Sequence, residues 1–440
     1  MLRSKYKSIL GLLLSAVVLL TAPMLLVAQD APAKKERKAT GTLSESTYRQ
    51  LERIHDLIAK NRNAEALEKL NGLLERAGND YEKAVVYQTT AFVHVSQNNF
   101  KGALKAFETA LQLDALPQQP YEQMLFNVAQ LYFQDGQSDK AASKLEQYFA
   151  EATLSPPADA HILLASVYAD RKRFRDALPQ VDQALAKVKE PKESWLQLKL
   201  ALHFELKQYP QCAEVLVRLI QLAPQKEDYW KQLSSVFFEV KQDKESLAVL
   251  ALAERQGYID TEGEFRNFAN VYLLMGIPYK AAEVLQRGLD AKALKADEKT
   301  LTLLGDAWAM AREYGRAEPA LKQAAAVADK GEIYFRLAQI YLEDEKWKPA
   351  LEMLDKAQAK GGLKKPGEAA FLTGVAAFNA GDTQRAIAAL QRAMNYDESR
   401  NNATQWIGHI RQTQEAAAQA AIAAAEAAQA AKNAAAVKKN

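Results

Sequence analysis

Residues 229–250 read YWKQLSSVFFEVKQDKESLAVL. Two small residues, Ser234 and Ser246, stand twelve positions apart in this stretch, and Leu250 follows the second by four. Residues spaced by four lie on one face of an α-helix, so Ser246 and Leu250 share a face. The polar run KQDKE between the two apolar segments is expected to turn the chain. The stretch therefore predicts a hairpin of two helices that approach closely at their small residues.

The small position of the second helix recurs along the chain at intervals of 33 to 38 residues. A large apolar residue follows it by four positions each time, as Phe107 follows Ala103. A fixed period of this length is the signature of a helical repeat. The recurring positions are Ala66, Ala103, Ala141, Ala177, Cys212, Ser246, Ala281, Ala317, Ala350 and Ala386.

A second small residue stands twelve positions earlier in eight of the ten units, with Ile54 and Leu200 as the exceptions. An aromatic residue is common three positions after it, and we expect this ring to fill the gap between the paired helices. The eight small residues are Ala91, Ala129, Ala165, Ser234, Ala269, Gly305, Ala338 and Gly374.

This repeated pair of small sites, twelve positions apart, resembles the tetratricopeptide repeat over roughly residues 48–400, in about ten units. The resemblance implies an all-α fold, an α-solenoid in which helix hairpins stack into a right-handed superhelix. Because each hairpin buries its apolar face only against a neighbour, the end units need polar caps. We expect such a cap at residues 402–411, followed by an exposed alanine-rich helix.

The flanking segments complete the predicted organisation of the chain. Residues 1–28 carry Arg3, Lys5 and Lys7 before an apolar run, which is typical of an export signal, with an uncleaved membrane anchor as the alternative. Residues 29–45 are predicted to be a flexible linker, 46–400 the solenoid, and 401–440 the cap and helical tail. Either interpretation of the first segment predicts a periplasmic location, with an inner-membrane anchor facing the periplasm as the alternative.

The composition of the chain bears on two questions, nucleic-acid binding and cysteine chemistry. The 57 basic and 54 acidic residues nearly cancel, which gives no support for a nucleic-acid partner, although a locally basic groove is compatible with it. The single cysteine, Cys212, has no internal partner for a disulfide. Its small, buried register position predicts an inert thiol.

The sequence contains no pattern that indicates catalysis, a cofactor or a metal. The five histidines are scattered, and there is no phosphate-binding glycine loop or nucleophile elbow. We therefore expect a non-enzymatic protein that binds other proteins, with an enzyme whose site lies hidden in the groove as a remote alternative.

In the tetratricopeptide family the first helix of each pair lines the concave face. We expect the side chains in this groove to lie at fixed distances from the small sites of the first helices. Most of them stand three residues before a small site, or one or four residues after it. Seven phenylalanines among them would form an apolar track for a helix or an extended peptide. The set is Phe126, Gln130, Phe133, Gln197, Phe204, Lys231, Phe238, Arg266, Asn270, Phe335, Arg336, Gln339, Phe371 and Phe378.

Some family members clamp a terminal carboxylate with a basic residue and an asparagine one turn apart. Arg266 and Asn270 resemble this pair, but Leu303 and Glu332 occupy two other positions of the clamp. A receptor for chaperone tails is therefore disfavoured.

Residues 229–250, residues 264–288 and the tripeptide Gln405-Trp406-Ile407 resemble exported repeat proteins of bacterial TonB-type energy-transduction systems. This resemblance implies a periplasmic accessory of an inner-membrane complex that serves outer-membrane transport. A scaffold for envelope assembly or motility, with other cell-envelope partners, is the alternative.

Overall fold

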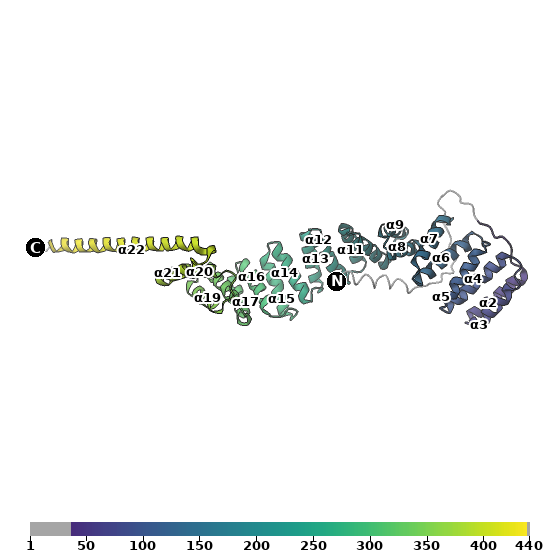
Figure 1. Ribbon diagram of the computed structural model, residues 1–440, viewed down its shortest axis with the longest axis horizontal. Helices are drawn as coiled ribbons and strands as arrows, with labels where there is room; N and C mark the ends of the chain where they lie inside the picture. The colour runs from purple at the N-terminus through teal and green to yellow at the C-terminus, as the bar shows by residue number, and fades with distance from the viewer. Residues whose placement is uncertain (1–36, 438–440) are drawn as a thin grey trace. The chain divides into compact units, whose positions relative to one another are not determined.

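The computed structural model describes residues 37–437, and it is helical nearly throughout. The predicted export signal or anchor, and residues 29–36 of the predicted linker, lie outside the described residues. The chain divides into two compact units, residues 1–241 and 242–440. Within the described part, 21 α-helices follow one another in stacked hairpins, so the all-α, solenoid-type prediction is confirmed (Figure 1).

Five hairpins and one further helix make up the described part of the first unit. The helices are α2 (Glu45–Ala59), α3 (Asn63–Leu74), α4 (Asp80–Ser96), α5 (Phe100–Gln112), α6 (Gln118–Gln134), α7 (Ser138–Glu151), α8 (Ala158–Asp170), α9 (Phe174–Ala186), α10 (Glu193–Glu205), α11 (Tyr209–Leu222) and α12 (Glu227–Glu239).

The second unit begins with α13, continues with four hairpins and closes with one long helix. The helices are α13 (Asp243–Arg255), α14 (Glu262–Leu274), α15 (Pro278–Asp290), α16 (Glu298–Met310), α17 (Tyr314–Val327), α18 (Glu332–Glu343), α19 (Trp347–Lys360), α20 (Pro366–Asn379), α21 (Thr383–Ala393) and α22 (Asp397–Val437).

The small positions of the second helices lie in the core, as the register predicted. All ten, from Ala66 to Ala386, are at most 1% exposed. The large residues that follow them by four, such as Leu145 and Leu321, are fully buried or nearly so. A Cβ atom added at Gly305 would lie 2.4 Å from Cγ of Leu321. The small residue of one helix therefore provides the space that the large residue of its partner fills.

Each turn between paired helices uses a residue with left-handed backbone five positions before the second small site. Gly136 (φ 75°) does so between α6 and α7, and Lys172 (φ 58°) between α8 and α9. The next amide closes the turn: Gln137 N donates to Tyr132 O at 2.8 Å, and Arg173 N to Tyr168 O at 2.8 Å. This six-to-one bond ends a helix in the Schellman manner. The aromatic register position thus also accepts the hydrogen bond that stops the first helix.

Residues 37–44 form a strap that crosses three hairpins before α2 begins. Arg37 lies 4.0 Å from the ring centre of Tyr121, forms an ion pair with Asp114, and its carbonyl accepts from Gln118 N at 3.1 Å. Further along, the Ser44 amide donates to the Glu82 carboxylate at 2.8 Å. This bond is the main reason that the pKa of Glu82 lies below its usual value. The strap thus holds the first hairpin to the second and third.

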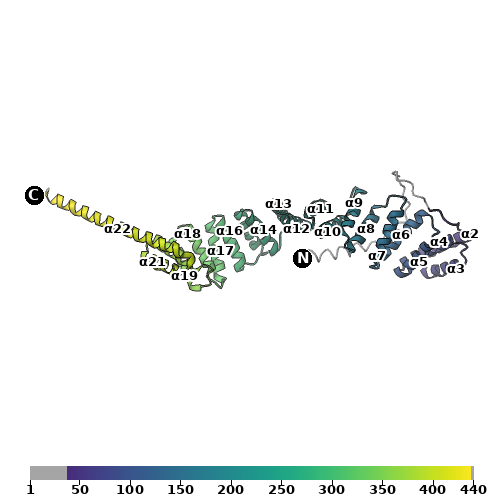
Figure 2. The same cartoon turned by 45° about the horizontal axis from the view of Figure 1, so that its top comes forward.

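Helix α22 is a single helix that contains both the predicted cap and the predicted tail (Figure 2). Ser399, Ala403, Ile407 and Ile410 on its first turns are buried, and it packs on α20 and α21. Residues 411–430 are all exposed. Among residues 37–437 no helix combines the length and apolar character needed to cross a membrane.

Candidate protein-binding surface

The first helix of each hairpin carries a stripe of side chains beside its small site. On α6 this stripe is Phe126, Gln130 and Phe133, spaced by four and three residues, so that all three lie on one helical face. All three are half-buried. The Phe126 ring centre lies 5.8 Å from that of Tyr148 in α7. The stripe therefore rests on the core with one edge and faces outward with the other.

On α10 the stripe is partly used within the fold. Gln197 Nε2 donates to the Tyr229 hydroxyl at 2.6 Å and to the Glu193 carboxylate at 3.0 Å, which joins α10 to α12. Burial, together with the bond to Glu193, raises the pKa of Tyr229 well above its usual value. Phe204 is half-buried, and its ring centre lies 6.3 Å from that of Tyr209 in α11. Gln197 is thus a structural contact, while Phe204 keeps an exposed edge.

Helix α12 presents the most exposed ring of the predicted set. Phe238 is 48% exposed. Lys231, on the same stripe, is half-buried and pairs with Glu227 at 3.4 Å. The first unit therefore supplies four phenylalanines with accessible edges, together with an amide and a cation.

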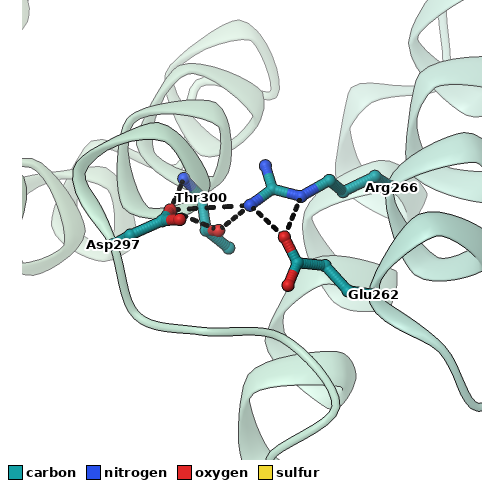
Figure 3. A network of polar contacts seen from close by, with 4 residues as sticks. All are labelled: Glu262, Arg266, Asp297 and Thr300. Atoms are coloured by element: carbon teal, nitrogen blue, oxygen red, sulfur yellow. Dashed lines mark hydrogen bonds and ion pairs between the residues drawn. The ribbon is translucent and has the colours of Figure 1, made fainter.

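In the second unit, Arg266 of α14 lies in a polar network (Figure 3). Its Nε and Nη2 atoms donate to the Glu262 carboxylate at 3.2 and 3.1 Å, and Nη2 also donates to the Thr300 hydroxyl at 2.5 Å. Asp297 accepts from the amide and the hydroxyl of Thr300, both at 2.7 Å. The amide bond is the main reason that the pKa of Asp297 lies below its usual value.

This network occupies the arginine of the pair that resembles a carboxylate clamp. The Arg266 side chain is 14% exposed and faces two carboxylates, which neutralise it. Its Nη1 atom is buried without a hydrogen-bond partner in the described part of the chain. Asn270 is exposed one turn further along α14. Arg266 thus ties α14 to α16, and we expect no ligand carboxylate there.

The α18 members of the predicted set differ in their surroundings. Arg336 forms an ion pair with Asp306 of α16, and Gln339 is half-buried. Phe335 is 6% exposed and lies in the core instead of an open groove. Phe335 is therefore no part of an accessible surface, contrary to its predicted place in the groove.

The α20 members, Phe371 and Phe378, are covered by α22. Their ring centres lie 6.4 and 6.1 Å from that of Trp406, edge to face. His409 completes the cluster at 6.0 Å from Phe378. These two rings stabilise the C-terminal cap. The aromatic residue of the Gln405-Trp406-Ile407 tripeptide was the available sequence signal for this contact, but it did not indicate which rings it would cover.

Residues 37–437 contain no group of three or more histidine, cysteine or acidic side chains that could hold a metal ion. Cys212 is buried, and burial raises the pKa of its thiol to about 12. A protonated thiol is a poor nucleophile, as its register position predicted.

A family model described as tetratricopeptide repeat matches residues 91–156, 126–193 and 335–403. No curated protein matches the chain. Among solved structures, a tetratricopeptide repeat protein from Parabacteroides merdae is 14% identical, covers 59% of this chain and 99% of its own, and has a TM-score of 0.34. A MamA protein is 18% identical, with 40% and 94% coverage and a TM-score of 0.34.

The protein YrrB, described as a tetratricopeptide repeat protein with an unusual peptide-binding site, is 16% identical. The match covers 44% of this chain and 99% of YrrB, with a TM-score of 0.36. The matches to the family model begin in the α4–α5 hairpin of the first unit and return in α18 to α22 of the second. The same register of small and large residues runs through the hairpins between them, so the chain resembles tetratricopeptide repeat proteins both within and between the matched segments.

Proposed function

We propose that the chain is an exported, non-enzymatic scaffold that captures a protein partner on the first-helix stripes of its first unit. The observation that supports this most is the exposure of Phe238 together with the accessible edges of Phe126, Phe133 and Phe204 on the same face of their first helices. Exposed aromatic side chains beside polar groups are typical of binding surfaces for an amphipathic helix or an extended peptide.

We further propose a setting in the periplasm, as an accessory of a TonB-type energy-transduction system. Two sequence features support this proposal: the apolar run after Arg3, Lys5 and Lys7, and the resemblance of residues 229–250 and 264–288 to the exported repeat proteins of such systems. The partner would then be a cell-envelope protein. Membrane association would come from the N-terminal segment or from that partner.

Replacing Phe133, Phe204 and Phe238 together by Ser tests the binding surface. We expect capture of the partner from crosslinked cell envelopes to fall strongly, while far-ultraviolet circular dichroism stays unchanged. The matched control replaces Leu154, Val217 and Leu222, which are 37–47% exposed outside the stripes, by Ser. Equal loss in the control, or lost helicity in the triple variant, would contradict the assignment.

Cell fractionation tests the setting. A mature chain in the periplasmic or inner-membrane fraction agrees with the proposal, whereas a cytoplasmic chain that retains Met1 excludes it. Mass spectrometry of the crosslinked partners then distinguishes the two kinds of scaffold. Recovery of envelope-assembly or motility components without TonB machinery would replace the proposed system by the alternative.

A further inference from the structure

The first hairpin exposes a face that is buried in the next three hairpins. Arg49 and Arg53 of α2 stand five residues and one residue before Ile54, which occupies the small-site position. Both arginines are exposed. In α4, α6 and α8 the same two positions hold residues that are at most 8% exposed: Val86 and Thr90, Met124 and Val128, and Ala160 and Leu164.

A groove of about 650 Å³ lies on this face between α2 and α3. Its lining includes Arg49 and Arg53 on α2, Lys69 and Gly72 on α3, and Arg76 just beyond the end of α3. With Glu45 as the one acidic residue among the lining residues, four cations give the groove a formal charge of +3. The whole chain has the same formal charge spread over 440 residues, so the groove is a strong local concentration of positive charge.

Two of the four cations have no acidic partner among residues 37–437. Arg49 pairs with Glu45, and Lys69 lies 3.8 Å from Glu65. No ion pair involves Arg53 or Arg76 within the described residues, and both side chains are exposed. Arg53 stands on α2 and Arg76 just beyond the end of α3, so the two cations reach the groove from different elements.

We propose that this basic groove binds an acidic segment of a partner protein. The positive charge of the lining favours an anionic occupant, because carboxylates of a bound segment could form ion pairs with both Arg53 and Arg76. The groove, at about 650 Å³, is large enough for several side chains of a polypeptide segment. A single phosphate would leave most of this space to solvent. The groove is separate from the phenylalanine stripes and does not depend on the function proposed for them.

The test uses the full chain and a fluorescein-labelled peptide of ten glutamates, followed by fluorescence anisotropy. We expect binding that weakens as salt rises, because exposed charge pairs are screened. Arg53→Glu with Arg76→Glu should weaken binding by at least about tenfold, which corresponds to roughly 1.4 kcal/mol. The neutral pair Arg53→Gln and Arg76→Gln should give an intermediate loss. Circular dichroism and thermal unfolding verify that each variant remains folded.

Lys101→Glu with Lys105→Glu makes the same charge change on the exposed side of α5 and serves as the control. Affinity retained within about twofold in this control supports the groove. An equal loss in the control, or no binding by the unaltered chain, overturns the proposal. Groove-dependent binding to phosphatidylserine vesicles, or competition by inorganic phosphate without peptide binding, would also overturn it and assign the groove to phosphate groups.

Discussion

A pair of residues, one small and one large, determines how closely the helices of a hairpin approach. At Gly374 of α20, an added Cβ atom would lie 2.5 Å from Cγ of Leu390 and 3.1 Å from the backbone oxygen of Ala386, both in α21. Leu390 and Ala386 are fully buried, so neither can move aside without disturbing its neighbours.

We expect Gly374→Ala to destabilise the second unit by about 1–3 kcal/mol through overpacking, even though alanine is the better helix former. Gly408→Ala in α22 is the control, because an added Cβ atom there meets nothing within 4 Å. Urea unfolding measures both variants. Equal midpoints would mean that the glycine does not set the helix approach.

The packing positions could be predicted residue by residue, because each buried pair needs a small and a large residue at fixed places in the repeat. The exposure of individual stripe residues could not. Phe335 and Phe238 occupy comparable stripes, yet one is buried and the other is 48% exposed. This difference depends on the neighbouring hairpins, and a single-repeat register does not contain it.

At the level of the elements, the ten turns share one backbone conformation but not one residue type. Glycine supplies the positive φ at Gly136, Gly276 and Gly381, whereas Lys207, Arg312 and Glu345 adopt it with a side chain. A left-handed conformation costs a non-glycine residue about 1–2 kcal/mol. The turns were predicted from their polar composition. Their conformation was not, because packing of the paired helices imposes it on residues that do not favour it.

We expect Glu345→Gly, in the turn between α18 and α19, to raise stability by about 0.5–1 kcal/mol, since strain relief exceeds the entropy that glycine loses. The reverse change, Gly136→Ala between α6 and α7, should lower stability by about 1–2 kcal/mol. Differential scanning calorimetry of the two variants checks the pair. Shifts of the same sign would show that the turn conformation is not the controlling factor.

Across the whole molecule, stability should depend on pH through two buried histidines of the first unit. The Nδ1 atoms of His161 and His203 donate to the side-chain oxygens of Gln180 and Gln208, both at 2.8 Å. Burial is the main reason that the pKa of each ring lies below 6.5. Below pH 6.5 the unfolded chain therefore binds protons that the folded chain does not.

Stability should consequently be full above pH 6.5 and fall as the pH drops from there towards the lower folded values. Urea midpoints between pH 7.5 and 5.5 measure this slope. The variant His161→Gln with His203→Gln should show a flatter profile over the same interval. An unchanged slope would assign the dependence to other groups.

The two ends of helix α22 contribute different properties: its first turns contribute stability and its exposed tail contributes helix content. Truncation after Gln414 should reduce helical ellipticity but change the free energy of unfolding by no more than about 0.5 kcal/mol, because residues 411–430 are exposed. In contrast, Ile410→Ala should cost about 2–5 kcal/mol, because Ile410 is fully buried. Circular dichroism and urea unfolding report the two quantities. A large loss on truncation would mean that the tail contacts the solenoid.

The strap has a consequence for how the first unit opens. In a stack of repeats, the end unit touches one neighbour and is ordinarily the first to fray. Here α2 follows directly after the strap, and Arg37 of the strap is bound by Gln118 and Asp114, which lie beyond the second hairpin. Local opening of α2 must therefore break contacts with the third hairpin as well. Amide hydrogens of α2 should exchange with solvent at rates close to those of α6, which would make three hairpins one cooperative unit.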